Sequence, residues 1–284
     1  MKVLVTGSDG QLGYDIIRLL NIQGVSYIGL DRKTIDLRDM SGVANLIRTY
    51  SPDVIIHCAA YTNVDLAERE PEICRLINVD GTANIAKVSQ EIGSKLVYIS
   101  TDYVFSGEGS KPYDIDSTKS PLSVYGRTKL DGENEVIKRT EQYFIIRTSW
   151  SFGINGKNFV NAMLNLGKKQ RVVDVVKDQI GSPTYTLDLS SLIIEMINTD
   201  KYGIYHATNE GYCSRAEFAK EIFRQAGIDA EVNSISSDEY SSLAVRPKNS
   251  RLSKSSLDFA SFKRLPKWED SLSKYLLEFE SRQE

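Results

Sequence analysis

Short runs of Val, Ile and Leu alternate with amphipathic stretches along the first 150 residues of the chain. The apolar runs have the length and β-branched content of buried strands, and they are Lys2–Thr6, Val25–Leu30, Val54–Cys58, Leu96–Ser100 and Phe144–Thr148. Between them, apolar residues recur at helical spacing in Gln11–Gln23, Ser41–Tyr50, Pro71–Ile92 and Leu122–Thr140. Alternating strands and helices form right-handed crossovers, so this pattern predicts a doubly wound α/β fold with a parallel sheet covered on both faces.

The pattern changes after Trp150, where glycines and asparagines cluster. Further helices are expected at Phe159–Leu166, Leu187–Ile197 and Ser214–Ala226, with strands at Arg171–Val176 and Tyr202–His206. The tail, Ser236–Glu284, is polar and predicts only short helices. We therefore expect a main domain at 1–150 and a smaller C-terminal α/β region at 151–284, of which roughly 178–206 returns to the main sheet.

Composition narrows the function classes. The net charge of -3 and pI of about 5.6 give no reason to expect binding to nucleic acid or to a membrane. An anionic substrate would then need a local basic patch. The three cysteines are scattered without metal-ligand spacing, and an odd number argues against a disulfide framework. No cleavable signal precedes the first strand and no apolar run has the length of a membrane span, so a cytoplasmic location is expected.

A glycine-rich turn follows the first strand and opens the first helix. Its sequence, Gly7 to Gly13, contains Gly10, Gln11 and Leu12 and has the spacing GxxGxxG rather than GxGxxG. Glycine allows a tight turn and close backbone approach, and the helix N-terminus offers free N–H groups to a pyrophosphate. A purely structural turn is the alternative, but the position between strand and helix favours a dinucleotide site.

The residues after the second strand bear on the identity of the dinucleotide. Asp31 lies where an acid binds a ribose hydroxyl, whereas the adjacent Arg32 and Lys33 suit a 2′-phosphate. These signals favour NADPH slightly and predict that NADH is also usable. Further cofactor contacts are expected from two short segments, Asp36-Leu37 and Ala59-Ala60-Tyr61-Thr62.

Candidate catalytic residues lie in two segments further along. Ser100, Thr101, Asp102 and Tyr103 follow the fourth strand, at the edge of the sheet where open α/β folds bind ligands. Tyr125 and Lys129 stand four residues apart on one predicted helix, which places both side chains on the same face. There the ammonium is expected to lower the pKa of the phenol toward neutrality.

This arrangement predicts reduction of a carbonyl group. A hydride leaves the nicotinamide for a ketone carbon while Tyr125 protonates the forming alkoxide. Lys129 keeps the phenol acidic and holds the nicotinamide ribose, and Thr101 donates a hydrogen bond to the oxygen.

Together these residues resemble the extended short-chain dehydrogenase/reductase superfamily and, within it, the dTDP-4-dehydrorhamnose reductase family. The resemblance runs nearly end to end. Its motifs are GSDGQLG (7–13), HCAAYTNVDLAE (57–68), STDYVFSG (100–107), YGRTKLDGE (125–133), RTSWSFG (147–153), NFVNAML (158–164), DQIGSPT (178–184) and RPKNSRL (246–252).

The resemblance implies a Rossmann-type NAD(P)-binding domain at 1–150 and a nucleotide-sugar-binding region at 151–284. It implies that Thr101, Tyr125 and Lys129 form the catalytic group. Ser100, Tyr125 and Lys129 are also expected to contact the cofactor. The substrate contacts implied are Thr101, Asp102, Tyr103, Tyr125, Trp150, Asn158, Phe159 and Arg246. An ordinary structural role stays open for several of these, Asn158 as a helix cap among them.

The related 4,6-dehydratases carry Asp-Glu where this chain has Asp102-Tyr103. Because Tyr103 is no base at neutral pH, reduction without elimination is favoured.

The reaction implied is NADPH-dependent reduction of the 4-keto group of a dTDP-linked sugar. Some members of the family hold Mg²⁺ between carboxylates at a dimer interface. This chain offers only Asp15 and Asp188 there, a poor cage for magnesium, so no metal is predicted and a homodimer is left open. The competing hypotheses are a non-catalytic NADP-binding regulatory subunit, and a reductase or epimerase of another nucleotide sugar.

Overall fold

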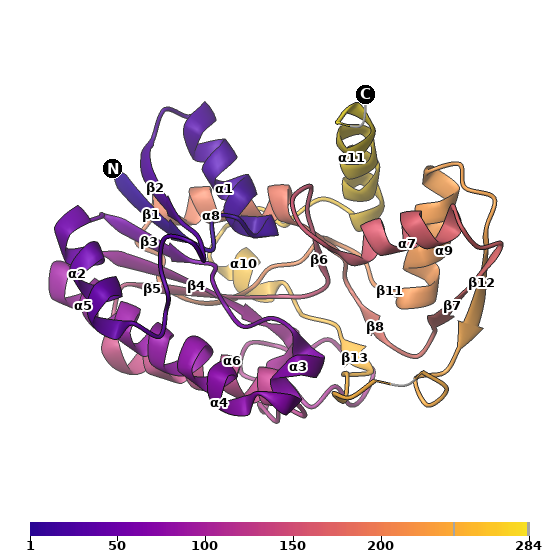
Figure 1. The fold of residues 1–284 in the computed structure, drawn as a ribbon, viewed down its shortest axis with the longest axis horizontal. Helices are drawn as coiled ribbons and strands as arrows, with labels where there is room; N and C mark the ends of the chain where they lie inside the picture. Colours follow the sequence, from indigo (N-terminus) through magenta and orange to yellow (C-terminus); the bar gives the residue numbers. More distant parts are fainter. Residues whose placement is uncertain (241, 283–284) are drawn as a thin grey trace.

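The computed structural model describes residues 1–240 and 242–282. Its main sheet has six parallel strands in the order β10-β5-β4-β3-β1-β2 (Figure 1). Their bounds are β1 Lys2–Thr6, β2 Ser26–Leu30, β3 Val54–His57, β4 Lys95–Thr101, β5 Tyr143–Thr148 and β10 Gly203–His206. The chain order reverses between β1 and β3, which is the point where doubly wound sheets bind ligands. The predicted doubly wound parallel sheet is confirmed.

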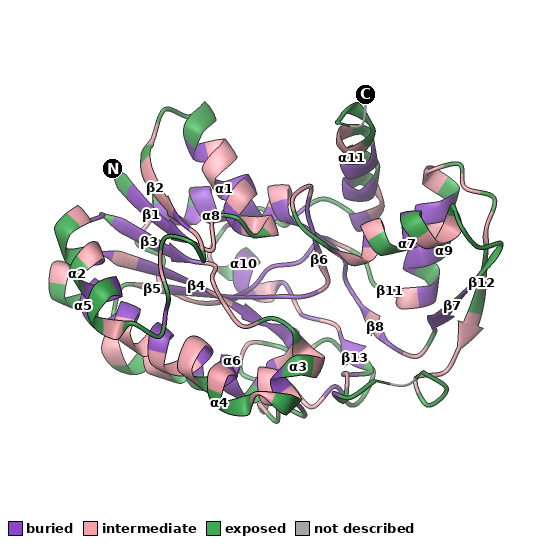
Figure 2. Cartoon of the chain, viewed as in Figure 1, coloured by how far each residue is buried: buried purple, intermediate pink, exposed green. Residues whose placement is uncertain are grey.

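Helices cover both faces of this sheet, and its central strands are buried along nearly their whole length (Figure 2). One face packs against α1 and α8, and the other against α2, α5 and α6. The bounds of these helices are α1 Gln11–Ile22, α2 Met40–Tyr50, α5 Thr82–Ile92, α6 Val124–Arg139 and α8 Thr186–Ile197. Leu257 of the short helix α10 (Ser255–Phe259) extends the first of these cores, together with Phe262 and Leu265, which follow the helix.

A smaller region with its own apolar core lies beside the main sheet (Figure 1). It contains α7 (Phe159–Gly167), α9 (Arg215–Gln225), α11 (Trp268–Ser281) and the parallel pair β7 (Val172–Val176) and β12 (Glu231–Ile235). Two further small sheets are built from β6 Ser151–Phe152, β8 Ile180–Gly181, β9 Thr184–Tyr185, β11 Cys213–Ser214 and β13 Asn249–Ser250. Of the segment 178–206, only α8 and β10 join the main sheet, because residues 180–185 pair within the small sheets.

The structure departs from the predicted elements most clearly in two helical segments. The helix expected over Pro71–Ile92 consists of α4 (Pro71–Arg75), a π-helical segment (Leu76–Gly81) and α5. The wide π turn places Asn78 so that its side chain bonds both the N–H and the carbonyl of Tyr61, at 2.7 and 3.2 Å. The tail is not limited to short helices, because α11 runs from Trp268 to Ser281 and buries an apolar face.

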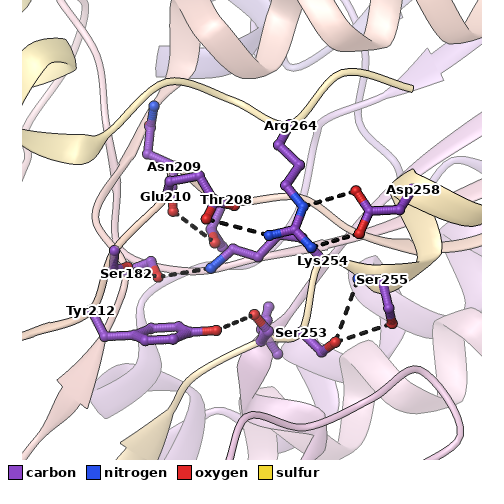
Figure 3. A network of polar contacts seen from close by, with 12 residues as sticks. Ser182, Thr208, Asn209, Glu210, Tyr212, Ser253, Lys254, Ser255, Asp258 and Arg264 are labelled. Atoms are coloured by element: carbon purple, nitrogen blue, oxygen red, sulfur yellow. Dashed lines mark hydrogen bonds and ion pairs between the residues drawn. The ribbon is translucent and has the colours of Figure 1, made fainter. Parts of the chain in front are cut away.

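A polar network joins the smaller region to the segment that follows β13 (Figure 3). At its centre lies Lys254, whose buried ammonium sits 4.2 Å from the ring centroid of Tyr212 and 3.4 Å from Ser182 Oγ. Ser182 in turn donates to the carbonyl of Gly211 and accepts at its own carbonyl from Ser149. These bonds fix the loop that carries Trp150.

Within the described residues, no helix is both long and apolar enough to span a membrane.

Candidate active site

The glycine-rich turn brings β1 and α1 close together. Gly7 adopts a φ of 68°, and its carbonyl accepts from the N–H of Gly10 at 3.0 Å. A Cβ on Gly13 would lie 2.2 Å from that carbonyl oxygen, so the helix can begin this close only with glycine there. Gly10 caps α1 without a side-chain bond, which leaves the first N–H groups of the helix for an anion.

A cavity of about 1140 Å³ opens at this turn, between the ends of β1 and β3. It exceeds the roughly 300–1,000 Å³ of ordinary small-molecule pockets and suits a dinucleotide. The predicted cofactor residues that line it are Gly7, Gly10, Gln11, Leu12, Gly13, Asp31, Arg32, Asp36, Leu37, Ala59, Ala60, Tyr61 and Thr62.

Other lining residues escaped the sequence analysis. They include apolar side chains of α3 (Val64–Arg69), α4 and the π-helical segment. Their helical spacing in the sequence predicts a buried face but does not indicate that a ligand covers it. Residues of the smaller region, Ser151, Gly156 and Lys157, close the cavity from the other side. Lys157 is tied there because its carbonyl accepts from the Gln11 side chain at 3.3 Å.

Asp31 and Arg32 both line the cavity but differ in what they offer a ligand. One oxygen of Asp31 accepts from the N–H groups of Lys33 and Thr34, each at 2.9 Å. These bonds lower the pKa of Asp31 and commit that oxygen to the loop. Arg32 lies in the lining without an ion pair among the described residues, and Lys33 is not part of the lining. The geometry therefore favours a 2′-phosphate on Arg32.

Tyr125 and Lys129 lie on α6, whose first turn packs against the end of β4. Ser123 caps the helix by accepting from the N–H of Gly126 at 3.1 Å. A Cβ on Gly126 would lie 2.3 Å from the carbonyl of Tyr103, so glycine permits this contact. As a result the rings of Tyr103 and Tyr125 meet edge to face, with centroids 5.5 Å apart.

Burial, not pairing, dominates the ionisation of these two groups. It raises the pKa of Tyr125, against the effect of a hydrogen bond with the Thr101 side chain. It also lowers the pKa of Lys129 to about 7, although Glu133 acts in the opposite direction. The Lys129 ammonium lies 3.9 Å from the ring centroid of Tyr98. The expected lowering of the Tyr125 pKa by Lys129 is therefore wrong, because burial of the phenol raises this pKa and Lys129 is not among the groups that act on it. The phenol stays protonated at neutral pH, as a proton donor must.

Residues 100–102 at the end of β4 are buried and already bonded to protein groups. Ser100 is not among the residues that line the cavity, and neither are Tyr125 and Lys129. The Ser100 hydroxyl donates to Glu133 Oε1 at 2.5 Å. Thr101 donates to Asp102 Oδ1 at 3.0 Å, while Asp102 Oδ2 has no hydrogen-bond partner among the described residues. Burial raises the pKa of Asp102 to about 6.

Glu133 and Arg147 form a buried ion pair beneath the site, which the sequence analysis did not identify. Each side chain is only 1% exposed. The guanidinium donates two hydrogen bonds to the carboxylate, at 2.9 and 2.7 Å. Since Glu133 also accepts from Ser100, the pair joins α6 to the strand ends that carry Thr101 and Trp150.

The predicted substrate residues of the smaller region lie in three places. Trp150 follows β5 with a φ of 49°. Phe159 stacks on Phe218 at 5.5 Å, and Asn158 caps α7 by accepting from Asn161 N at 2.9 Å, which is the structural role left open for it. Arg246 donates to Asp65 Oδ2 of α3 at 2.7 Å, linking the two sides of the site.

The carboxylates considered for a metal are each bonded elsewhere. Asp15 accepts from Thr186 Oγ1 at 2.5 Å, and Asp188 accepts from Asn209 Nδ2 at 2.9 Å. Within residues 1–240 and 242–282, no three His, Cys, Asp or Glu side chains lie together as metal ligands. These residues do not fit a magnesium ion, and no step of the chemistry below uses one.

Replacing Asp15 by Asn should remove a pH dependence of stability. Burial raises the pKa of Asp15 from 3.8 to about 6, so the folded chain binds more protons than the unfolded chain between these values. The free energy of unfolding of the wild type therefore falls as pH rises from about 4 to 6, by about 3 kcal/mol at most. Denaturant titrations should show D15N more stable than wild type above pH 6 and equal to it below pH 4. The exposed variant Asp131→Asn is the control, and a D15N curve parallel to wild type would contradict the argument.

Comparisons with known proteins agree with this geometry. The model of the RmlD substrate binding domain matches residues 1–281. The spore coat polysaccharide biosynthesis protein SpsK of Bacillus subtilis is 40% identical over 277 residues, covering 98% of this chain and 97% of that protein. A dTDP-4-dehydrorhamnose reductase of Aggregatibacter actinomycetemcomitans is 39% identical over 264 residues, covering 88% of this chain and 90% of that enzyme. The crystal structure of a dTDP-4-dehydrorhamnose reductase from Bacillus anthracis in complex with NADP superposes with a TM-score of 0.95 at 42% identity, covering 98% and 99% of the two chains.

Proposed function

The chain belongs to the RmlD substrate-binding domain family, and from this we propose that it catalyses the NADPH-dependent reduction of dTDP-4-dehydro-β-L-rhamnose to dTDP-L-rhamnose. The observation that carries the proposal is the position of Thr101, Tyr103 and Tyr125. Thr101 ends β4, Tyr103 follows it and Tyr125 lies on the first turn of α6. All three therefore meet at the carboxyl edge of the sheet, in a chain similar to such reductases over nearly its whole length. The reaction is the last step of dTDP-rhamnose biosynthesis, which makes this an oxidoreductase of polysaccharide biosynthesis.

The site residues take the following roles in the proposed mechanism. NADPH, when bound, supplies the hydride to the C4 carbon of the sugar. Tyr125 donates its phenolic proton to the C4 oxygen, so that the ketone gains one hydride and one proton and becomes an alcohol. Thr101, whose hydroxyl donates to Asp102 Oδ1 in the structure, would turn its proton to the same oxygen. Lys129 would hold the ribose hydroxyls of the nicotinamide. Trp150 and Tyr103 offer aromatic surface to the sugar ring.

Loss of NADPH absorbance on addition of ketosugars tests the reaction. dTDP-4-dehydro-L-rhamnose, made in situ, should be reduced, whereas UDP- and GDP-linked 4-ketosugars should be reduced far more slowly. Absence of oxidation with every ketosugar, in a chain that still binds NADPH, would favour the regulatory subunit instead. Faster oxidation with another nucleotide would reassign the substrate.

Arg32 should set the preference for NADPH over NADH. Replacing it with Gln removes a charge-assisted bond to the 2′-phosphate, which is expected to raise the KM for NADPH roughly 10- to 100-fold. The KM for NADH should stay unchanged, because NADH lacks that phosphate. Lys33→Gln is the matched control, since Lys33 does not line the cavity. A larger effect from Lys33→Gln than from Arg32→Gln would assign the 2′-phosphate to Lys33 and contradict this prediction.

The proposal includes a cytoplasmic location, because a biosynthetic reductase of nucleotide sugars uses cytoplasmic NADPH. A homodimer stays open, as in the sequence analysis.

A further inference from the structure

Arg215 is an arginine of the site that no part of the chemistry above employs. It is the first residue of α9, and its guanidinium lies 3.8 Å from the ring centroid of Trp150 and 5.0 Å from that of Phe159. The start of the helix is fixed independently by a capping box, in which Ser214 and Glu217 exchange side-chain and backbone hydrogen bonds. The aromatic faces hold the planar cation in one place without help from a carboxylate.

Among the described residues, the Arg215 side chain has no bonded partner, whereas those of Arg147 and Arg246 do. Arg147 is held by Glu133 and Arg246 by Asp65. Among residues 1–240 and 242–282, no carboxylate lies within 4.0 Å of the Arg215 guanidinium, and the guanidinium donates no hydrogen bond. A guanidinium has five N–H donors. The half-buried guanidinium of Arg215 bonds none of these donors to protein, so they can donate hydrogen bonds to a ligand.

The surroundings of Arg215 indicate which ligand. Arg246 is close enough to lower the pKa of Arg215, while Tyr103 and Asp102 act in the opposite direction and burial has the largest effect. Two guanidinium groups therefore share this part of the site, in a chain whose net charge is -3. Asp102, 3% exposed, also has an oxygen without a protein partner there, as expected of a site built for polar ligand groups. The pyrophosphate of the dinucleotide belongs to the glycine turn, and Arg215 does not line that cavity.

We propose that Arg215 binds the diphosphate of the nucleotide sugar and determines the affinity for the nucleoside diphosphate part of the substrate. The proposal rests on the proposed function for the class of substrate. Trp150 and Phe159 position the guanidinium so that its fork of N–H groups meets the phosphate oxygens. Arg246 adds a second cation near the diphosphate, although its charge is partly neutralised by Asp65.

Comparing the binding of dTDP and of thymidine to the NADPH-loaded protein distinguishes the contribution of the diphosphate to affinity from that of the nucleoside. By titration calorimetry, Arg215→Gln should weaken dTDP binding roughly 10- to 100-fold, the range for one hydrogen-bonded charge. Thymidine and NADPH should bind as they do to wild type, because neither ligand meets Arg215. Arg215→Lys should fall between wild type and Arg215→Gln, since it keeps the charge and loses the planar fork. The control is Arg224→Gln, which removes an exposed arginine paired with Glu221 on the same helix and should change nothing.

Wild-type affinity of Arg215→Gln for dTDP would overturn the proposal, and so would an equal loss of thymidine binding. If Arg215→Gln no longer binds NADPH, the milder Arg215→Lys decides, and its unchanged dTDP affinity would overturn the proposal as well. These binding measurements need no turnover. A chain that loses dTDP affinity on substitution but reduces no ketosugar would refute the proposed reaction and leave the diphosphate site in place.

Discussion

Replacing Tyr125 by Phe is expected to lower turnover with the dTDP-linked ketosugar about 10²- to 10⁴-fold, the usual contribution of a positioned general acid. The phenol is the candidate proton donor because it lies on the capped first turn of α6, with its ring against that of Tyr103 at the end of β4. Burial keeps it protonated at neutral pH. Phe retains the ring and its edge-to-face contact with Tyr103, so the dissociation constant of NADPH should hardly change. Steady-state kinetics and NADPH fluorescence titration give the two readouts.

Two other tyrosines make this result specific. Tyr113, which stacks on Phe105 and donates to the carbonyl of Glu108, lies outside the proposed site, and Tyr113→Phe should keep wild-type turnover. Tyr103 is the competing proton donor because its ring meets that of Tyr125. If Tyr103→Phe lost more turnover than Tyr125→Phe, the acid would have to be reassigned to Tyr103.

Replacing Glu133 by Gln is expected to cost about 3–5 kcal/mol of unfolding free energy, the usual effect of leaving one charge of a buried pair without its partner. Gln has nearly the shape of Glu, but it leaves the cation of Arg147 buried without a countercharge, with both side chains 1% exposed in the wild type. A Gln oxygen can still accept from Ser100, so the loss should come mainly from the charge. Urea unfolding at pH 7 measures it.

The same helix supplies a matched control. Glu135 pairs with Arg139 at 2.5 Å on the partly exposed side of α6, and Glu135→Gln should cost about 1 kcal/mol or less. Equal losses for the two variants would mean that the buried pair contributes no more than a surface pair. In that case Glu133 and Arg147 would not explain how the site is held.

The periodicity of the sequence was sufficient to predict the main sheet because its strands are buried on both faces and separated by amphipathic helices. Elements that depend on distant partners were harder to predict. Two-residue strands such as β8 and β13 exist only because residues far apart in sequence meet there. The π-helical segment inside Pro71–Ile92 was predicted as part of an ordinary helix, because its i→i+5 backbone bonds leave no mark in the sequence. In the folded chain its Asn78 contacts Tyr61.

In the site, too, features fixed by the local sequence could be predicted, whereas features that depend on distant residues could not. The glycine turn and the Tyr125–Lys129 spacing carry their geometry locally, so their positions could be predicted from the sequence. The ionisation of Tyr125 could not be predicted, since it depends on how deeply the folded chain buries the ring. Arg215 also escaped notice, because an arginine at a helix start has no distinctive local pattern until the fold brings Trp150 beside it.

Transfer of deuterium from labelled NADPH to the sugar tests the central claim most directly. The chain is incubated with dTDP-4-dehydro-L-rhamnose and NADPH that carries deuterium at the transferable position of the nicotinamide, and the product is examined by NMR. We expect one deuterium at C4 of the sugar for each NADPH consumed, at a rate that Tyr125→Phe sharply reduces. A sugar without deuterium at C4, or label transfer that does not slow in Tyr125→Phe, would contradict it.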